Sequence, residues 1–347
     1  MNTVPARTAA PREHPPARGL LWLVGRQHRA ALCAGLALVA AVAAYILWMR
    51  ADMVGYLRAH GIEGCAQWRA GCGPHSEAYA HVNRAYRDPL LNTGRLILAL
   101  PALAGVFLGA PLFARELESG TYRLMWSQSV GRVRWAVAKL ALPAAAVLAG
   151  TTALSVLYTW WWRAARLAMP DVTWGTAVPF DTTGPAQVAL AALLFFLGAA
   201  IGLLLPRTLP AMAATLAAGA GAQYGLDTLR PRLMPRATVV SDATGDFGRV
   251  PDEVFHTSWR GGPQGQLTPS GTKIPLERCL SAEGESGTET CFARLGATRR
   301  AYEELHPAGH YWPLQWIQAG ICLSAAAALA AFCVWWVRRR PAVKETA

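Results

Sequence analysis

Long apolar runs alternate with polar stretches along the whole chain. Each run holds about 20 residues without Asp, Glu, Lys or Arg, the length that an α-helix needs to cross a bilayer. Because lipid cannot satisfy backbone hydrogen bonds, such runs are expected to be helices. The pattern predicts an all-α polytopic membrane protein with six transmembrane helices, near residues 30–48, 96–114, 140–162, 187–205, 209–226 and 314–337.

The run at 209–226 differs from the other five. It is rich in Ala and Gly and has Pro210 near its start, so a short or re-entrant segment is the alternative to a full span. The polar remainder divides into a tail with an amphipathic segment (1–29), a loop between the second and third spans (115–139), a long loop (227–311) and a basic tail (338–347).

Basic residues near the span ends predict the orientation of the chain. With six spans, both tails and the 115–139 loop fall on one side, and these short segments are rich in Arg. That side is expected to be the cytoplasm, because short basic loops stay inside. The loops at 50–95, 163–186 and 227–311 then lie outside. The net charge of +12 alone would also fit nucleic-acid binding, but the membrane pattern accounts for it and we expect no nucleic-acid partner.

Cysteine positions agree with this topology. Cys65 and Cys72 lie in the first outer loop, and Cys279 and Cys291 lie in the last. An oxidising compartment permits disulfides, so we predict the bonds Cys65–Cys72 and Cys279–Cys291. The alternative for the first pair is a metal site with His75 and His81, but the spacing matches no tight zinc pattern.

Motifs for chemistry are missing from the sequence. It contains no GxxxxGK[ST] phosphate loop, no HExxH and no GxSxG. The predicted spans also lack the ionisable residues that mark proton relays and ion-coupled carriers. We therefore expect no catalytic, cofactor or metal site in this chain, and any uphill transport would need another subunit to supply energy.

Three GxxxG patterns lie within the spans. They predict close contacts between helix backbones, either inside the bundle or between protomers. The pairs are Gly105 with Gly109, Gly198 with Gly202, and Gly221 with Gly225.

The polar stretch between the second and third spans is the most distinctive part of the chain. It reads RELESGTYRLMWSQSVGRVRWAVAK from Arg115 to Lys139, and its apolar positions after Tyr122 recur with helical spacing. Gly120 offers a bend, and Ser129 could cap the helix that follows. The sequence predicts a short helical elbow at the membrane surface. An interfacial helix without a partner is the alternative.

Three stretches resemble the membrane subunits of bacterial type-2 ABC exporters with six spans. They are WLVGRQHR before the first span, ARELESGTYRLMWSQSVGRVRWAVAK between the second and third, and HYWPLQWIQAGICL with VWWVRRR at the last. The resemblance implies a non-catalytic permease subunit of the bacterial plasma membrane. It also implies a connecting helix before the first span, which we place at Gly19–Arg29.

Two kinds of partner follow from this resemblance. A separate ABC ATPase, which carries ATP and Mg, would dock on the cytoplasmic elbow, and a second permease copy would complete a homodimer or heterodimer. The ATPase-coupling positions that the resemblance implies are Glu116, Gly120, Thr121, Arg123, Trp126, Gln128, Ser129, Arg132 and Arg134.

Two other classes of protein remain as alternatives. One is a membrane sensor or scaffold that reports on its outer loops without transport. The other is a membrane enzyme for lipid-linked substrates, with Asp171, Asp181, Glu303 and Glu304 as loose candidates that we interpret as solvated loop charges. We interpret His306 and His310 as surface histidines, since Pro307 between them opposes a regular helix. The 227–311 loop is rich in Gly, Pro, Ser and Thr, so we expect a partly disordered or disulfide-pinned lid.

Overall fold

The structure is a computed structural model of the chain. It describes residues 22, 25, 26, 28–66, 76–121, 131–169, 171–242, 254, 257–280 and 284–339, and all structural statements refer to these.

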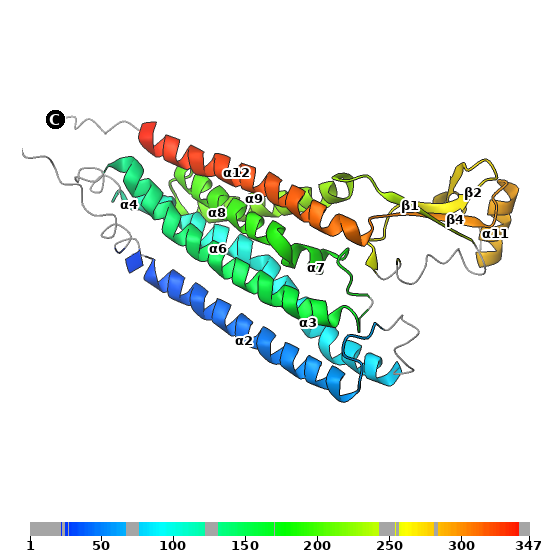
Figure 1. The fold of residues 1–347 in the computed structure, drawn as a ribbon. Helices are drawn as coiled ribbons and strands as arrows, with labels where there is room; N and C mark the ends of the chain where they lie inside the picture. Colours follow the sequence, from blue (N-terminus) through cyan, green and yellow to red (C-terminus); the bar gives the residue numbers. More distant parts are fainter. Residues whose placement is uncertain are drawn as a thin grey trace, which may run out of the picture.

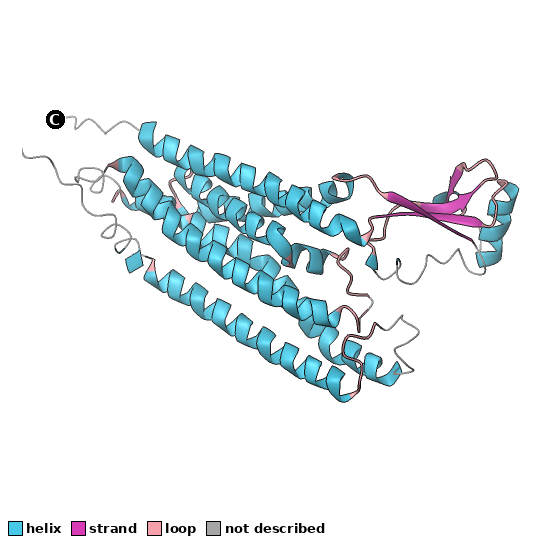
Figure 2. Ribbon diagram, in the orientation of Figure 1, coloured by secondary structure: helices cyan, strands magenta, loops and turns pink. Residues whose placement is uncertain are grey.

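Within the described residues, six long helical segments run side by side as a bundle (Figures 1 and 2). Consecutive segments run in opposite directions. One end of the bundle, here called the elbow end, holds the start of α2, the end of α4, the start of α6 and the end of α12. The opposite end, the β end, carries a small sheet (Figure 1). The segments are α2 (Arg29–Ala59), α3 (Ser76–Ala104) continued through η1 (Gly105–Gly109) into α4 (Pro111–Ser119), α6 (Arg132–Ala165), α8 (Gly184–Leu204), α9 (Thr208–Leu229) and α12 (Tyr311–Arg339).

Five of these segments are long and apolar enough to cross a membrane. They contain the first, second, third, fourth and sixth predicted spans, so the polytopic helical class is confirmed. The remaining segment, α9, is a continuous helix of 22 residues but does not belong to this set. The count of six membrane crossings therefore stays a prediction.

The helices extend beyond the predicted spans. α3 begins at Ser76 rather than near residue 96, and α6 begins at Arg132 with Gly131 as its N-cap. The predicted cap, Ser129, lies outside the described residues, and much of the expected 115–139 loop is helical. Only residues 120–131 separate α4 from α6.

α8 lies at the centre and contacts α3, η1, α4, α6, α9 and α12. Glycine allows this closeness: a Cβ on Gly198 would overlap the carbonyl oxygen of Gly105, and one on Gly202 would overlap that of Ala110. The predicted close contacts of two GxxxG pairs are thus confirmed, inside the bundle. The third pair, on α9, is different, because a Cβ on Gly221 or Gly225 would meet no described atom within 4 Å.

The β end carries an antiparallel sheet that the sequence did not predict. Its strands are β1 (Ala237–Asp242), β2 (Gln264–Leu267), β3 (Lys273–Pro275) and β4 (Arg300–Leu305), in the order β1-β4-β2-β3, with helix α11 (Gly284–Arg294) beside them (Figure 2). The described parts of 227–311 therefore include a folded unit around residues such as Ile274 and Phe292. It is called the outer domain below, after the predicted orientation of this segment.

One of the two predicted disulfides is present among the described residues. Cys279 is bonded to Cys291, which confirms that prediction and ties the last turn of α11 to the segment that follows β3. Cys65 is also disulfide-bonded. Its expected partner, Cys72, lies outside the described residues.

Candidate functional site

The predicted coupling residues that the structure describes lie at the elbow end, before and after residues 122–130. Glu116, Gly120, Thr121, Arg132 and Arg134 are described, whereas Arg123, Trp126, Gln128 and Ser129 lie outside the described residues. Gly120 ends α4 with φ of 71°, a left-handed conformation that glycine adopts without strain. The chain therefore leaves the second span through a sharp turn, as the sequence predicted for this glycine.

Glu116 points into the bundle and forms an ion pair with Lys139 on α6. Lys139 is 1% exposed, and its ammonium lies 5.0 Å from the ring centroid of Trp135 and 5.5 Å from that of Phe113. The pair joins the last turn of α4 to the second turn of α6, across the base of the elbow. The second carboxylate oxygen of Glu116 has no hydrogen-bond partner among the described residues.

Glu118, two residues further along α4, contacts α9 instead. Its carboxylate accepts hydrogen bonds from the backbone N–H of Thr208, at 2.9 Å, and from the Thr208 hydroxyl, at 2.6 Å. The N-cap residue of α9 is Arg207, which makes no side-chain cap. The N-terminus of α9 is thus capped by a residue 90 positions earlier in the chain.

Arg132 and Arg134 lie in the first turn of α6, which contains no acidic residue. Cations at a helix N-terminus oppose the helix dipole, so this position does not favour the stability of α6. Arg134 is exposed. These arginines are suited to an anionic surface, either a lipid headgroup layer or acidic residues of another protein.

A second buried ion pair lies at the β end. Arg230, at the end of α9, is paired with Asp181 of the short helix α7 (Ala177–Thr182), and both are nearly fully buried. Arg230 also donates to Asp227 at 2.9 Å and to Gln318 of α12 at 3.1 Å. Burial raises the pKa of Asp181 to about 6, while Arg230 opposes that shift. The interpretation of Asp181 as a solvated loop charge was wrong.

Polar side chains around this pair connect α7 and α8 to α12. Gln315 donates to the carbonyl of Phe180 at 2.7 Å and accepts from the backbone N–H of Ala186 at 3.1 Å. The Thr183 hydroxyl lies 2.8 Å from that of Tyr311. This network holds the break between α7 and α8.

Aromatic residues attach the outer domain to the bundle. Trp174 packs edge-on against Trp259, and its Nε1 donates to the carbonyl of Thr257 at 2.7 Å. Trp259 stacks on His306, whose Nδ1 lies 3.2 Å from that of His310. His306 is 2% exposed, so its interpretation as a surface histidine was wrong. Burial lowers the pKa of His306, and so does His310, while the Pro231 carbonyl opposes them.

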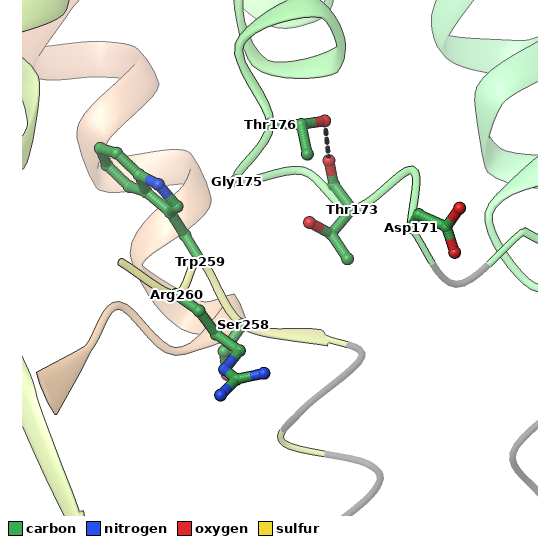
Figure 3. A pocket seen from close by; sticks show the side chains of 7 residues that line it. All are labelled: Asp171, Thr173, Gly175, Thr176, Ser258, Trp259 and Arg260. Atoms are coloured by element: carbon green, nitrogen blue, oxygen red, sulfur yellow. Dashed lines mark hydrogen bonds between the residues drawn. The ribbon is translucent and has the colours of Figure 1, made fainter. Parts of the chain in front are cut away.

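A shallow pocket lies beside this attachment (Figure 3). Thr173 and Asp171 line one side and Ser258, Trp259 and Arg260 line the other, around a volume of about 240 Å³. The described candidate carboxylates near it are in ion pairs: Asp171 with Arg87, and, in the sheet, Glu303 with Arg260 and Glu304 with Lys273. Glu303 is buried, so its interpretation as a solvated loop charge was wrong as well. Since Asp181 is also paired, each of the four candidate carboxylates has a cation partner.

The helical bundle can now be compared with known proteins. Residues 36–230, more than half of the chain, match the model of the family described as "ABC-2 membrane transporter related". The chain belongs to this family. The match covers the bundle from α2 to the end of α9 and includes the elbow. The chain is therefore a multi-pass membrane protein and a permease-like component of transport, in a family whose members generally work with an ABC ATPase.

The matched region of this ABC-2 family protein ends at Arg230, so the sheet and α12 lie beyond it. No curated protein matches the chain.

Sequence reasoning found the elbow but missed Glu118, Lys139 and Arg230. A charged residue at the edge of an apolar run is ordinarily assigned to the membrane interface, where it needs no partner. A search for possible partners could have found these residues. Each lies at the same end of the predicted bundle as an oppositely charged residue or the N-terminus of a helix.

Proposed function

We propose that this chain is the permease subunit of an ATP-driven ABC exporter. It forms the translocation path with a second permease copy and couples to a separate ATPase subunit that binds ATP and Mg. The observation that carries the proposal is the family match, which spans the elbow. The chain hydrolyses no ATP in this scheme.

The anchoring of the elbow supports a role in force transmission. The buried Glu116–Lys139 pair ties α4 to α6, the two helices that flank the elbow. Arg134 and the four predicted coupling residues in 122–130 are then the positions for ATPase contact. Glu116 faces Lys139 inside the bundle, so its part in coupling is to support the elbow.

The distribution of arginines and disulfides between the two ends of the bundle supports a location in the bacterial plasma membrane, with both termini in the cytoplasm. The elbow end holds arginines at the starts of α2 and α6 and at the end of α12. The β end holds the Cys279–Cys291 disulfide, which an oxidising exterior permits. Short basic segments inside and disulfides outside give the same orientation.

The face of α9 that carries Gly221 and Gly225, here called its open face, supports the presence of a second permease copy. α9 is the one long described helix that is not apolar enough to be counted as a span, and Gly221 and Gly225 face no described atom. Small residues let helix backbones approach closely in lipid. Differently tagged copies of the chain are expected to co-purify if the permease is a homodimer.

The test is purification of the tagged chain from its native membrane in mild detergent, followed by mass spectrometry. We expect a stoichiometric chain with an ATPase phosphate loop. Arg123→Glu and Trp126→Ala should each weaken its recovery and leave membrane insertion intact. Matched controls at the β end are Arg278→Glu and Trp316→Ala, since both side chains are exposed there.

Two outcomes would contradict the proposal. Unchanged ATPase recovery with both elbow variants would remove the coupling role of the elbow. Recovery of the chain alone, or with a signalling kinase, would favour a membrane sensor or scaffold that uses the folded outer domain as its receptor.

A further inference from the structure

The N-terminus of α9 depends on a side chain from another helix. The first backbone N–H groups of a helix have no partner inside the helix, and a cap is usually supplied by the residue just before it. In α9 that residue is Arg207, which supplies none. The carboxylate of Glu118 takes this place, with one hydrogen bond to the backbone of Thr208 and one to its hydroxyl.

The contact joins the N-terminus of α9 to the last turn of α4. A carboxylate at a helix N-terminus is favoured by the helix dipole as well as by hydrogen bonds, so it holds the end of the helix in place. Glu118 lies in the last turn of α4, two residues before the Gly120 turn. Any displacement of the elbow therefore reaches Glu118 before it reaches the rest of the second span.

α9 also has an apolar contact with this helix, α4, since Ala211 is buried against Ala110 and Ala114. It packs against α8, η1 and α4. Its side chains are largely exposed, and only Ala211, Thr215, Gly219 and Leu226 are buried. The hydrogen bonds of Thr208 to Glu118 are the polar link that joins its elbow end to the helix that enters the elbow.

We propose that Glu118 is a positioning residue for coupling, which makes α9 move with α4 when the elbow is displaced. The inference rests on the proposed function, because it needs an ATPase that displaces the elbow. Thr208 is the receiving residue on α9. The output of the movement is a change in the position of α9, the helix whose open face is available to the second permease copy.

The experiment measures the position of α9 in the purified complex with its ATPase. Spin labels are attached at Leu36→Cys on α2 and Leu216→Cys on α9, since both leucines are exposed. Cys33, which is exposed, is replaced by Ser, while Cys322 and Cys333 are buried. Labelled chain is diluted with unlabelled chain, so that distances within one chain are read without nucleotide and with ATP and vanadate.

We expect a nucleotide-dependent shift of this distance in the parent chain and loss of the shift in Glu118→Ala, with unchanged recovery of the ATPase. Glu118→Gln should give a partial shift, because the amide oxygen still accepts a hydrogen bond but carries no charge. Thr208→Val should reduce the shift and Thr208→Ser should keep it. Glu277→Ala, an exposed carboxylate of the outer domain, removes the same charge and should change nothing.

A full shift in Glu118→Ala would overturn the inference, and so would a parent complex that binds ATPase without any shift. If Glu118→Ala does not fold, Glu118→Gln and Thr208→Val decide in its place. If the proposed function itself is wrong, the result is different, because no ATPase would co-purify with the parent chain.

Discussion

Each end of the bundle contains one buried ion pair, but the surroundings of the two pairs differ. At the β end, Arg230 contacts Asp181, Asp227 and Gln318, so several helices share one network. At the elbow end, Glu116 contacts Lys139 with one oxygen, while the other lacks a described hydrogen-bond partner. A fully satisfied buried network favours one arrangement, whereas a partly satisfied pair is easier to rearrange. The comparison suggests that the bundle is fixed at the β end and adjustable at the elbow end.

The largest effect should come from breaking the β-end network. Arg230→Met leaves the Asp181 carboxyl buried without its cation, which typically costs about 3–5 kcal/mol. Thermal unfolding of the purified chain in mild detergent measures the loss. Arg232→Met, at an exposed arginine two residues away, should have almost no effect. Adding Asp181→Asn to Arg230→Met should restore most of the stability, and a double variant as unstable as the single one would contradict this account.

Breaking the elbow-end pair should cost less. Lys139→Met leaves Glu116 unpaired, but this carboxylate is 13% exposed and can be hydrated or protonated, so we expect about 1.5–3 kcal/mol. The same unfolding measurement applies, with Arg134→Met as the exposed control and Glu116→Gln as the compensating change. A loss as large as that of Arg230→Met would show that the two ends are equally fixed, and the comparison would fail.

The middle of the bundle offers a matched pair of glycines. Gly198→Ala places a methyl group against the carbonyl oxygen of Gly105, and overpacking of this kind costs about 1–3 kcal/mol. Gly221→Ala on α9 meets no described atom, so it should be neutral or slightly stabilising. Unfolding midpoints of the two variants separate the predictions. Equal losses would mean that α9 is covered on its open face in the purified protein.

The helices were predictable because their signal is local. About 20 consecutive apolar residues require a helix in lipid, whatever lies elsewhere in the chain. The sheet was not predictable in this way. β2 and β3 contain only four and three residues, and β1 pairs with a strand more than 60 residues later, with Ala237 opposite Leu305. Strands that are this short and this distant leave little pattern in the sequence.

The elbow was likewise visible as a polar stretch, but its contacts were not. Glu116 looked like a residue for a partner, whereas Glu118 had no predicted role. The structure separates them by direction, since α4 turns one toward Lys139 and the other toward Thr208. Asp181 looked like a loop charge because α7 has only six residues and Arg230 lies 49 positions away. In each case the deciding contact is tertiary.

The smallest expected effect tests how firmly the outer domain is attached to the β end. The pKa of His306 is lowered in the folded chain, so the unfolded state takes up the proton more readily. The contribution of His306 to stability is therefore complete above its ordinary pKa of about 6.5 and is lost as the pH falls below that value. The charged or titratable neighbours that oppose its protonation are His310 and Arg236.

Hydrogen exchange of β1 and β4 at about pH 7.5 and about pH 5, expressed as protection factors that are corrected for the intrinsic pH dependence of amide exchange, measures this effect, with lower protection expected on the acidic side of the His306 transition. His306→Phe keeps an aromatic ring against Trp259 but cannot titrate, so its exchange should depend less on pH. If the parent and His306→Phe respond equally, the pH dependence arises elsewhere. The contact of Trp259 with His306 would then be a fixed part of the β end, and the difference between the two ends of the bundle would extend to the outer domain.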